Sequence, residues 1–205
     1  EGSKQFLESL SLWKDLNLYA EPIKMIKVFD RVKSNQIFFE NSENKKKLGY
    51  VIKNSDFSAL LRKKLNKKNI IILNNSELLK TTIEKGIRKS CTKNHIINSK
   101  IIIASDGKNS KVRDFIGTNI YTKKYSENAL VINFFHENFL DNIAYEIFYK
   151  NGPLAILPMK SSSKFYQSTI IWSNKCNLVN KLIELEDEFL KNYIEERAGN
   201  IIGKI

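Results

Sequence analysis

The sequence KIIIASDGKNSKVR, residues 100–113, joins an apolar run to a polar turn and a potential helix start. Residues 100–104 have the short, β-branched composition of a buried strand. Asp106 and Gly107 follow directly, and Ser110 is of a residue type that caps helices. In an open parallel sheet, ligands bind beyond the carboxyl ends of the strands. The stretch therefore predicts an α/β fold with a ligand site at this turn.

The side chains of this turn suit a ligand that carries hydroxyls and phosphates. The Asp106 carboxylate can accept hydrogen bonds from ribose or ribityl hydroxyls, and Gly107 lets the backbone approach a ligand without a Cβ in the way. Ser110 can aim backbone N–H groups at an anion, and Arg113 can face a phosphate or tie the turn together. Alternatively, Asp106 and Gly107 only make a tight turn and Arg113 is a solvated helix residue. The spacing leaves both interpretations open.

The segments before this stretch alternate between strand and helix patterns. The expected elements are a helix over 4–18, strands over 23–29, 36–39 and 49–52, a helix over 57–65 and a strand over 70–73. Three lysines at 45–47 indicate a solvated turn. The β-α-β order indicates a parallel sheet with crossover helices. Two further short strands are expected between residues 87 and 97.

The pattern changes after the turn. Four strands, over 129–135, 143–148, 153–159 and 165–172, are expected to form a separate and largely antiparallel meander, with three serines at 161–163 in one turn. A final amphipathic helix is expected over 182–194. The predicted fold class is therefore mixed α/β, with one α/β unit interleaved with a mainly antiparallel sheet.

The charge is basic, but its distribution does not indicate nucleic-acid binding. The 205 residues carry 34 Lys and Arg against 22 Asp and Glu, a formal net charge of +12. The basic residues form short scattered runs, and Lys greatly outnumbers Arg, whereas nucleic-acid recognition favours the bidentate Arg fork. We expect a solvated surface first, an anionic membrane surface second and nucleic acid last.

The cysteines and histidines do not indicate a metal site. Cys91 and Cys176 are far apart and lack CxxC spacing, which fits a reducing cytoplasmic compartment. His136 opens the segment HENFL, which lacks the second His of the zinc motif HExxH. No apolar run approaches the roughly 20 residues that span a bilayer. The sequence names no catalytic acid or base.

Residues 104–113, ASDGKNSKVR, resemble the Asp-Gly fingerprint of class A flavoprotein aromatic hydroxylases. The core of that fingerprint is Asp-Gly, two residues, Ser, two residues and Arg, and all four positions match. Other segments resemble the ubiquinone-biosynthesis branch of the family: SLSLW at 9–13 (with Ser11 in place of the usual Gly), AEPI at 20–23, LGYVI at 48–52, AYEIF at 144–148, GPLAILP at 152–158 and IW at 171–172. The resemblance covers almost the whole chain.

The resemblance implies an FAD-dependent monooxygenase that uses NAD(P)H and O2 to hydroxylate a prenylated phenol in ubiquinone biosynthesis. It implies a Rossmann-like FAD/NAD(P)-binding domain over 1–20 and 51–125, and a substrate domain over 21–50 and 126–205. The residues that it implies for cofactor binding are Asp106, Gly107, Ser110 and Arg113. Those expected to face the flavin and substrate are Gly152, Pro153, Leu154, Pro158, Tyr145, Phe148 and Trp172. Plain core packing is the alternative role for the strand at 152–158 and for the three aromatic residues.

Two elements of the family pattern do not occur in the sequence. There is no G-x-G-x-x-G among the eight glycines, and there is no Gly-Asp-Ala motif. We therefore expect the sequence to be the middle part of a longer protein and the 205-residue chain to bind FAD weakly or not at all. The expected location is the cytoplasm, and a peripheral contact to the membrane or to a multi-enzyme assembly is left open. The alternatives are a flavin oxidoreductase acting on another phenol and a non-catalytic basic module that binds a membrane or nucleic acid.

Overall fold

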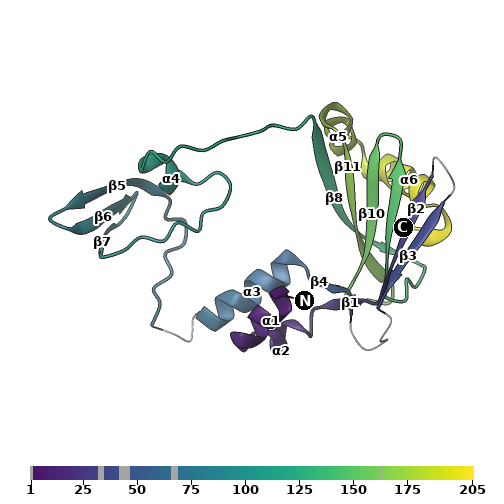
Figure 1. Cartoon of the computed structure of the whole chain (residues 1–205), viewed down its shortest axis with the longest axis horizontal. Coiled ribbons are helices and arrows are strands. Elements are labelled where there is room, and N and C mark those ends of the chain that lie inside the picture. Colours follow the sequence, from purple (N-terminus) through teal and green to yellow (C-terminus); the bar gives the residue numbers. More distant parts are fainter. Residues whose placement is uncertain (1, 32–34, 42–46, 66–68, 162) are drawn as a thin grey trace. The chain divides into compact units, whose positions relative to one another are not determined.

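A computed structural model describes residues 2–31, 35–41, 47–65, 69–161 and 163–205 of the chain (Figure 1). The chain forms two compact units: residues 1–67 with 125–205, and residues 68–124. Lys45, Lys46 and Ser162, which belong to two of the predicted turns, lie outside the described residues. The expected domains differ from these units because they divide the chain by the ligand that each part binds. They stay a prediction: cofactor binding over 1–20 with 51–125, and substrate binding over 21–50 with 126–205.

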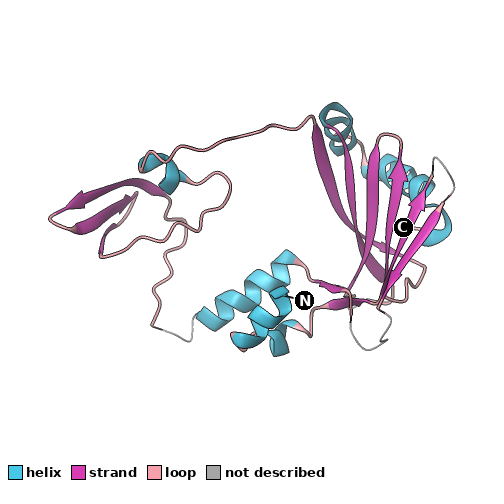
Figure 2. Ribbon diagram, viewed as in Figure 1, coloured by secondary structure: helices cyan, strands magenta, loops and turns pink. Residues whose placement is uncertain are grey.

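A six-stranded sheet in the order β3-β2-β9-β10-β11-β8 forms the centre of the first unit (Figure 2). Its strands are β2 (Met25–Asp30), β3 (Gln36–Glu40), β8 (Glu127–His136), β9 (Ile143–Tyr149), β10 (Gly152–Met159) and β11 (Tyr166–Lys175). The predicted antiparallel sheet is confirmed, and β9, β10 and β11 pair in chain order as a meander. β8 does not pair with its next strand β9, as a meander of all four strands requires, but with β11 at the edge of the sheet. β2 extends the sheet parallel to β9, and β3 pairs antiparallel with β2.

Alternation of side chains along the strands gives this sheet two different faces. Leu154 and Ile156 of β10 are fully buried in the main hydrophobic cluster, on what we call the packed face. Ala155 and Leu157, between and beside them, are half-buried on the opposite side, the open face. The GPLAILP segment therefore serves both faces of the sheet.

Two helices cover the packed face: α5 (Cys176–Ile183) and α6 (Asp187–Ala198). Val179 of α5 and Ile194 of α6 are both buried in the cluster that contains the strand residues. The prediction of one helix over 182–194 is wrong, because Glu186 has extended backbone angles and separates the two helices. The break lets each helix turn its own apolar side toward the sheet.

A smaller layer completes the first unit. It contains α1 (Gly2–Ser9), α2 (Trp13–Leu16), α3 (Asn54–Leu65) and the antiparallel pair β1 (Glu21–Ile23) and β4 (Gly49–Val51). The single helix expected over 4–18 is wrong, because Ser11 has a φ of 56°, outside the right-handed helical region. The rings of Trp13 and Tyr50 meet edge to face, with centroids 4.7 Å apart, and hold α2 against β4.

The second unit contains the antiparallel sheet β5 (Leu78–Glu84), β6 (Ile87–Thr92) and β7 (Ile96–Ser99), followed by α4 (Lys111–Phe115). The strands β6 and β7 confirm the two predicted between residues 87 and 97. The predicted buried strands over 70–73 and 100–104 are wrong: neither forms a strand, and Ile71 and Ile103 are 88% and 83% exposed. A parallel strand needs a neighbour for its N–H and C=O groups, and no described strand pairs with either segment. The expected β-α-β crossover is therefore not formed.

Candidate functional site

Ser110 and Asp106 organise the turn that precedes α4. The Ser110 hydroxyl donates a hydrogen bond of 2.5 Å to the Asp106 carboxylate and accepts one of 3.1 Å from the backbone N–H of Arg113. The other Asp106 oxygen accepts from the backbone N–H of Val112 at 3.2 Å. Gly107 makes the turn possible, because its φ of 80° lies in the region that side chains disfavour. The predicted cap at Ser110 is confirmed.

The guanidinium of Arg113 donates to the carbonyl oxygen of Lys108 at 3.0 Å, so this side chain ties the turn together. The hydrogen bond from Ser110, helped by the N–H of Val112, holds the pKa of Asp106 below its usual value, so the carboxylate stays ionised. The turn is thus internally bonded, as the simpler interpretation of the sequence requires.

The same turn keeps features that fit one edge of an FAD or NAD(P)H molecule. Asp106 is exposed, and a Cβ placed on Gly107 would meet no atom within 4 Å. A carboxylate has about four acceptor sites, so two bonds to the protein leave room for a cofactor hydroxyl. The residues present fit hydroxyl recognition, but the sequence contains no G-x-G-x-x-G to hold a pyrophosphate.

The open face of the six-stranded sheet is the second candidate site. It carries exposed apolar side chains, including Val131, which is 62% exposed, and Phe148, which is 46% exposed. A groove of about 380 Å³ at the β2–β3–β9 side of this face is lined by Val28, Asp30, Asn35, Ile37 and Phe148. Exposed apolar side chains beside a groove are typical of ligand or partner contacts.

The residues predicted to face flavin and substrate divide between the two faces. Leu154 and Trp172 are buried in the packed-face core, and Tyr145 packs against it. Trp172 stacks on Tyr193 of α6 with ring centroids 5.4 Å apart. These residues have the core role that the sequence left open as an alternative.

The remaining predicted residues lie along or beside β10. Pro153 pairs with Phe148 of β9, and both are on the open face. Pro158 is buried and pairs with Ser168 of β11 near the other end of the strand, where the pairing with β9 has already ended. Gly152 begins the strand with a φ of 131°. Pro153 and Pro158 are each the second residue from an end of β10, where a missing backbone N–H disturbs the sheet least.

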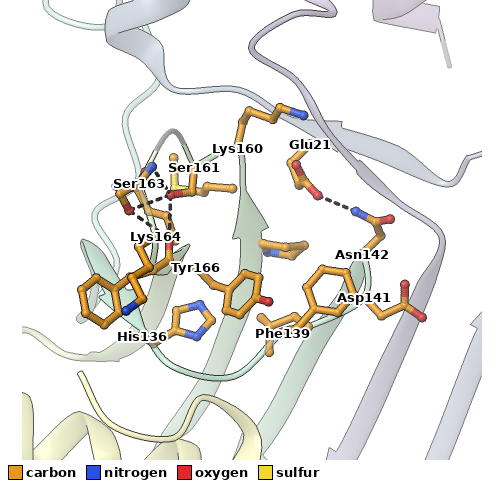
Figure 3. A pocket seen from close by; sticks show the side chains of 15 residues that line it. Glu21, His136, Phe139, Asp141, Asn142, Lys160, Ser161, Ser163, Lys164 and Tyr166 are labelled. Carbon is orange, nitrogen blue, oxygen red and sulfur yellow. Dashed lines mark hydrogen bonds between the residues drawn. The ribbon is translucent and has the colours of Figure 1, made fainter.

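A small pocket lies at one end of the first unit, beside His136 (Figure 3). Its cavity of about 200 Å³ is below the roughly 300 Å³ usual for small-molecule sites. Figure 3 shows Ser161 and Ser163 at one side and the hydrogen bond from Asn142 to Glu21 at the other. The pocket is lined by His136, Phe139, Tyr166, Lys160 and others, and the sequence did not indicate it.

His136 forms a buried pair with Ser168, whose hydroxyl lies 2.8 Å from His136 Nε2. The Nδ1 atom is buried without a hydrogen-bond partner among the described residues. Burial lowers the pKa of His136, so the ring is neutral at neutral pH. This follows from the position of His136 on the packed side of β8.

Glu146 of β9 is a further titratable residue to which the sequence gave no role. Burial alone raises the pKa of this carboxyl.

Among the described residues, no group of three or more His, Cys, Asp and Glu side chains is arranged to hold a metal ion. In the part of the chain that the structure describes, no helix is long and apolar enough to cross a membrane.

Comparison with known proteins relates the chain to ubiquinone hydroxylases. It is 25% identical over 203 residues to the ubiquinone hydroxylase UbiL of Rhodospirillum rubrum, which covers 98% of the chain and 46% of that protein. It is 23% identical over 200 residues to the human mitochondrial ubiquinone biosynthesis monooxygenase COQ6, which covers 91% of the chain and 42% of that protein. No family model matches. The resemblance to the ubiquinone-biosynthesis branch is confirmed, and the chain spans less than half the length of these relatives.

Solved structures identify the fold. The crystal structure of PqsL, a probable FAD-dependent monooxygenase from Pseudomonas aeruginosa, matches with a TM-score of 0.73 at 13% identity. The match covers 98% of this chain and 55% of PqsL. The chain therefore has part of the fold of an FAD-dependent monooxygenase, which confirms the predicted mixed α/β class.

Proposed function

We propose that this chain is part of an FAD-dependent monooxygenase that uses NAD(P)H and O2 to hydroxylate a prenylated phenol in ubiquinone biosynthesis. The observation that carries the proposal is the similarity to a ubiquinone hydroxylase along 98% of the chain. The monooxygenase fold supports it independently of sequence identity. Because the relatives are about twice as long, the activity is proposed for the protein that contains this chain.

Each unit of the chain, taken by itself, carries residues that suit one part of this function. The exposed Asp106 carboxylate accepts a cofactor hydroxyl, and Gly107 leaves space for the close approach of the cofactor. The apolar side chains of the open face hold an aromatic ring and exclude water from it. When bound, FAD would supply the transfer of electrons from NAD(P)H to O2. NAD(P)H would approach the same Asp-Gly turn, as the resemblance implies.

The test is to purify the protein that contains this chain and to measure its flavin content and its NAD(P)H consumption with a prenylated phenol. We expect bound FAD, phenol-dependent NAD(P)H oxidation and a product that has gained one oxygen atom. NAD(P)H oxidation without oxygen incorporation would support the alternative, a flavin oxidoreductase acting on another phenol. Absence of flavin would contradict both enzymes and leave a non-catalytic module.

We also propose a cytoplasmic location with a peripheral contact to an anionic membrane. The net charge of +12 supports the contact, since basic residues near an anionic surface each contribute about 1 kcal/mol. Both cysteines are free, which supports the reducing compartment. Sedimentation with anionic and with neutral lipid vesicles tests the contact. Binding that does not depend on lipid charge or on salt would contradict it.

A further inference from the structure

Glu146 lies within the open face of the six-stranded sheet. In the register of β9 it pairs with Val28 of β2 on one side and with Ala155 of β10 on the other. Its neighbour Ile147 is fully buried on the packed face, so alternation directs Glu146 to the open side. The cross-strand neighbours of this carboxyl group are therefore both apolar.

The surroundings of Glu146 differ from those of an ordinary surface carboxylate. The side chain is half-buried, and no hydrogen bond or ion pair joins it to another described residue. Burial is the cause that raises its pKa, with no charged group contributing. A partly desolvated acceptor without a partner is unfavourable for folding, and a bound donor would compensate that loss.

The chemistry of this face selects a particular kind of ligand. The apolar neighbours Val28, Ala155 and Phe148 favour a flat or aliphatic body, and the single acceptor favours one hydrogen-bond donor on that body. An aromatic ring with a hydroxyl group meets both requirements. A phosphate or carboxylate would be repelled by the ionised side chain.

We propose that Glu146 accepts the hydrogen bond of the ring hydroxyl of a phenolic substrate that lies on the open face. The inference rests on the proposed function, because it assigns the residue that orients the substrate ring. Accepting this bond fixes which edge of the ring points along the sheet. It also increases the electron density of the ring, which favours attack by an electrophilic oxygen.

Few other titratable groups face this position. On β2, Asp30 shares the open face and lies diagonally opposite, beside Phe148. On β10 the residues of the open face are Pro153, Ala155 and Leu157, none of which titrates. The pH dependence of phenol binding should therefore report Glu146, with Asp30 as the neighbour to be checked.

The experiment uses the protein that contains this chain, with FAD bound, and measures its binding of 4-nitrophenol. The phenol and phenolate forms of this probe differ in absorbance, so the bound form can be identified. For the unmodified protein we expect the neutral phenol to bind, with affinity falling when Glu146 is protonated at low pH. We expect Glu146→Gln to bind the neutral form roughly ten- to a hundredfold more weakly, since a hydrogen bond to a charged group is lost. The amide of the variant can donate, so its preference should shift toward the phenolate.

Two further variants and a product assay separate the possible failures. Glu188→Gln, an exposed change in α6, should leave the affinity and its pH profile unaltered. Asp30→Asn tests the neighbouring carboxylate: loss of the preference for the neutral phenol in this variant, with the preference kept in Glu146→Gln, would assign the acceptor to Asp30 and overturn the proposal. Equal affinity and the same pH profile in Glu146→Gln and in the unmodified protein would overturn the proposal. So would failure of the unmodified protein to bind the probe. Binding that depends on Glu146 without oxygen transfer to a prenylated phenol would keep this site and contradict the proposed function alone.

Discussion

The buried pair of His136 and Ser168 makes the stability of the first unit sensitive to acid. Burial lowers the pKa of His136 in the folded chain, so the unfolded chain binds more protons below its ordinary value near 6.5. Stability is therefore complete well above that value, and it falls as the pH decreases through 6.5 toward the lower pKa of the folded chain. His136→Gln should lower the free energy of unfolding at neutral pH by about 1–3 kcal/mol, because Ser168 loses its partner, and should flatten the pH dependence. Urea unfolding at a series of pH values measures both, and an unchanged slope in the variant would assign the acid sensitivity elsewhere.

Asp106 has two tasks that one substitution can separate. Its carboxylate caps α4 through Ser110 and Val112, and its exposed side is available to a cofactor hydroxyl. Asp106→Ala should speed hydrogen exchange at the amides of α4 and, in the intact protein, weaken FAD or NAD(P)H binding roughly ten- to a hundredfold. Ser110→Ala is the matched control, because it removes the cap and leaves the carboxylate. Similar cofactor affinity in the unmodified protein and in Asp106→Ala, with faster exchange, would make Asp106 a structural turn residue.

Strand β10 depends on the absence of a side chain at its first residue. A Cβ on Gly152 would lie 2.1 Å from the carbonyl oxygen of Ser173, and its φ of 131° is strained for any other residue. Gly152→Ala should therefore lower the free energy of unfolding by about 2–4 kcal/mol through displacement of β10 from β11. Gly86→Ala is the control: its φ is also positive, but no atom lies within 4 Å, so the loss should be only about 1–2 kcal/mol. Thermal and urea unfolding of both variants measures the two losses. Equal losses would show that strain, and not the close approach to Ser173, fixes Gly152.

Elements with a local signal could be predicted from the sequence, and elements that depend on distant partners could not. The four strands β8 to β11 follow from alternation within each strand and from the turn residues between them, and the cap at Ser110 follows from adjacent residues. The pairing of β8 with β11 joins the first of these strands to the last, which local alternation does not encode. The split between α5 and α6 depends on how each helix meets the sheet, which periodicity does not encode. The segments 70–73 and 100–104 have the composition of buried strands, but a strand also needs a hydrogen-bonding neighbour.

The same limit applies to the candidate sites. The Asp-Gly turn carries a motif of adjacent residues, so the sequence indicated Asp106, Gly107 and Ser110 correctly as one structural group. Glu146 lies within the AYEIF segment, but that segment does not show where its carboxyl points, because its environment is made by the pairing of β9 with β2 and β10. To find it from the sequence, one would need to know which side chains of β9 point to each face and which face the helices cover.

At the scale of the whole molecule, two apolar segments, 70–73 and 100–104, pair with no strand among the described residues. Ile71, Ile101 and Ile103 are 88%, 76% and 83% exposed, within runs that have strand composition. Such runs with unpaired backbone are templates for association between chains. We expect the chain to self-associate at micromolar concentration, and the double substitution of Ile71→Lys with Ile103→Lys to shift it toward the monomer.

The control adds the same two charges at positions that are already polar and exposed. Asn94→Lys with Asn98→Lys changes net charge equally but leaves the apolar runs intact, so association should persist. Sedimentation velocity at several concentrations measures the outcome for all three proteins. If both double variants become monomeric to the same extent, repulsion between net charges controls association, and the exposed isoleucines do not. If only the isoleucine variant does, the two runs are the contact surface, because the charge change is identical in the two proteins.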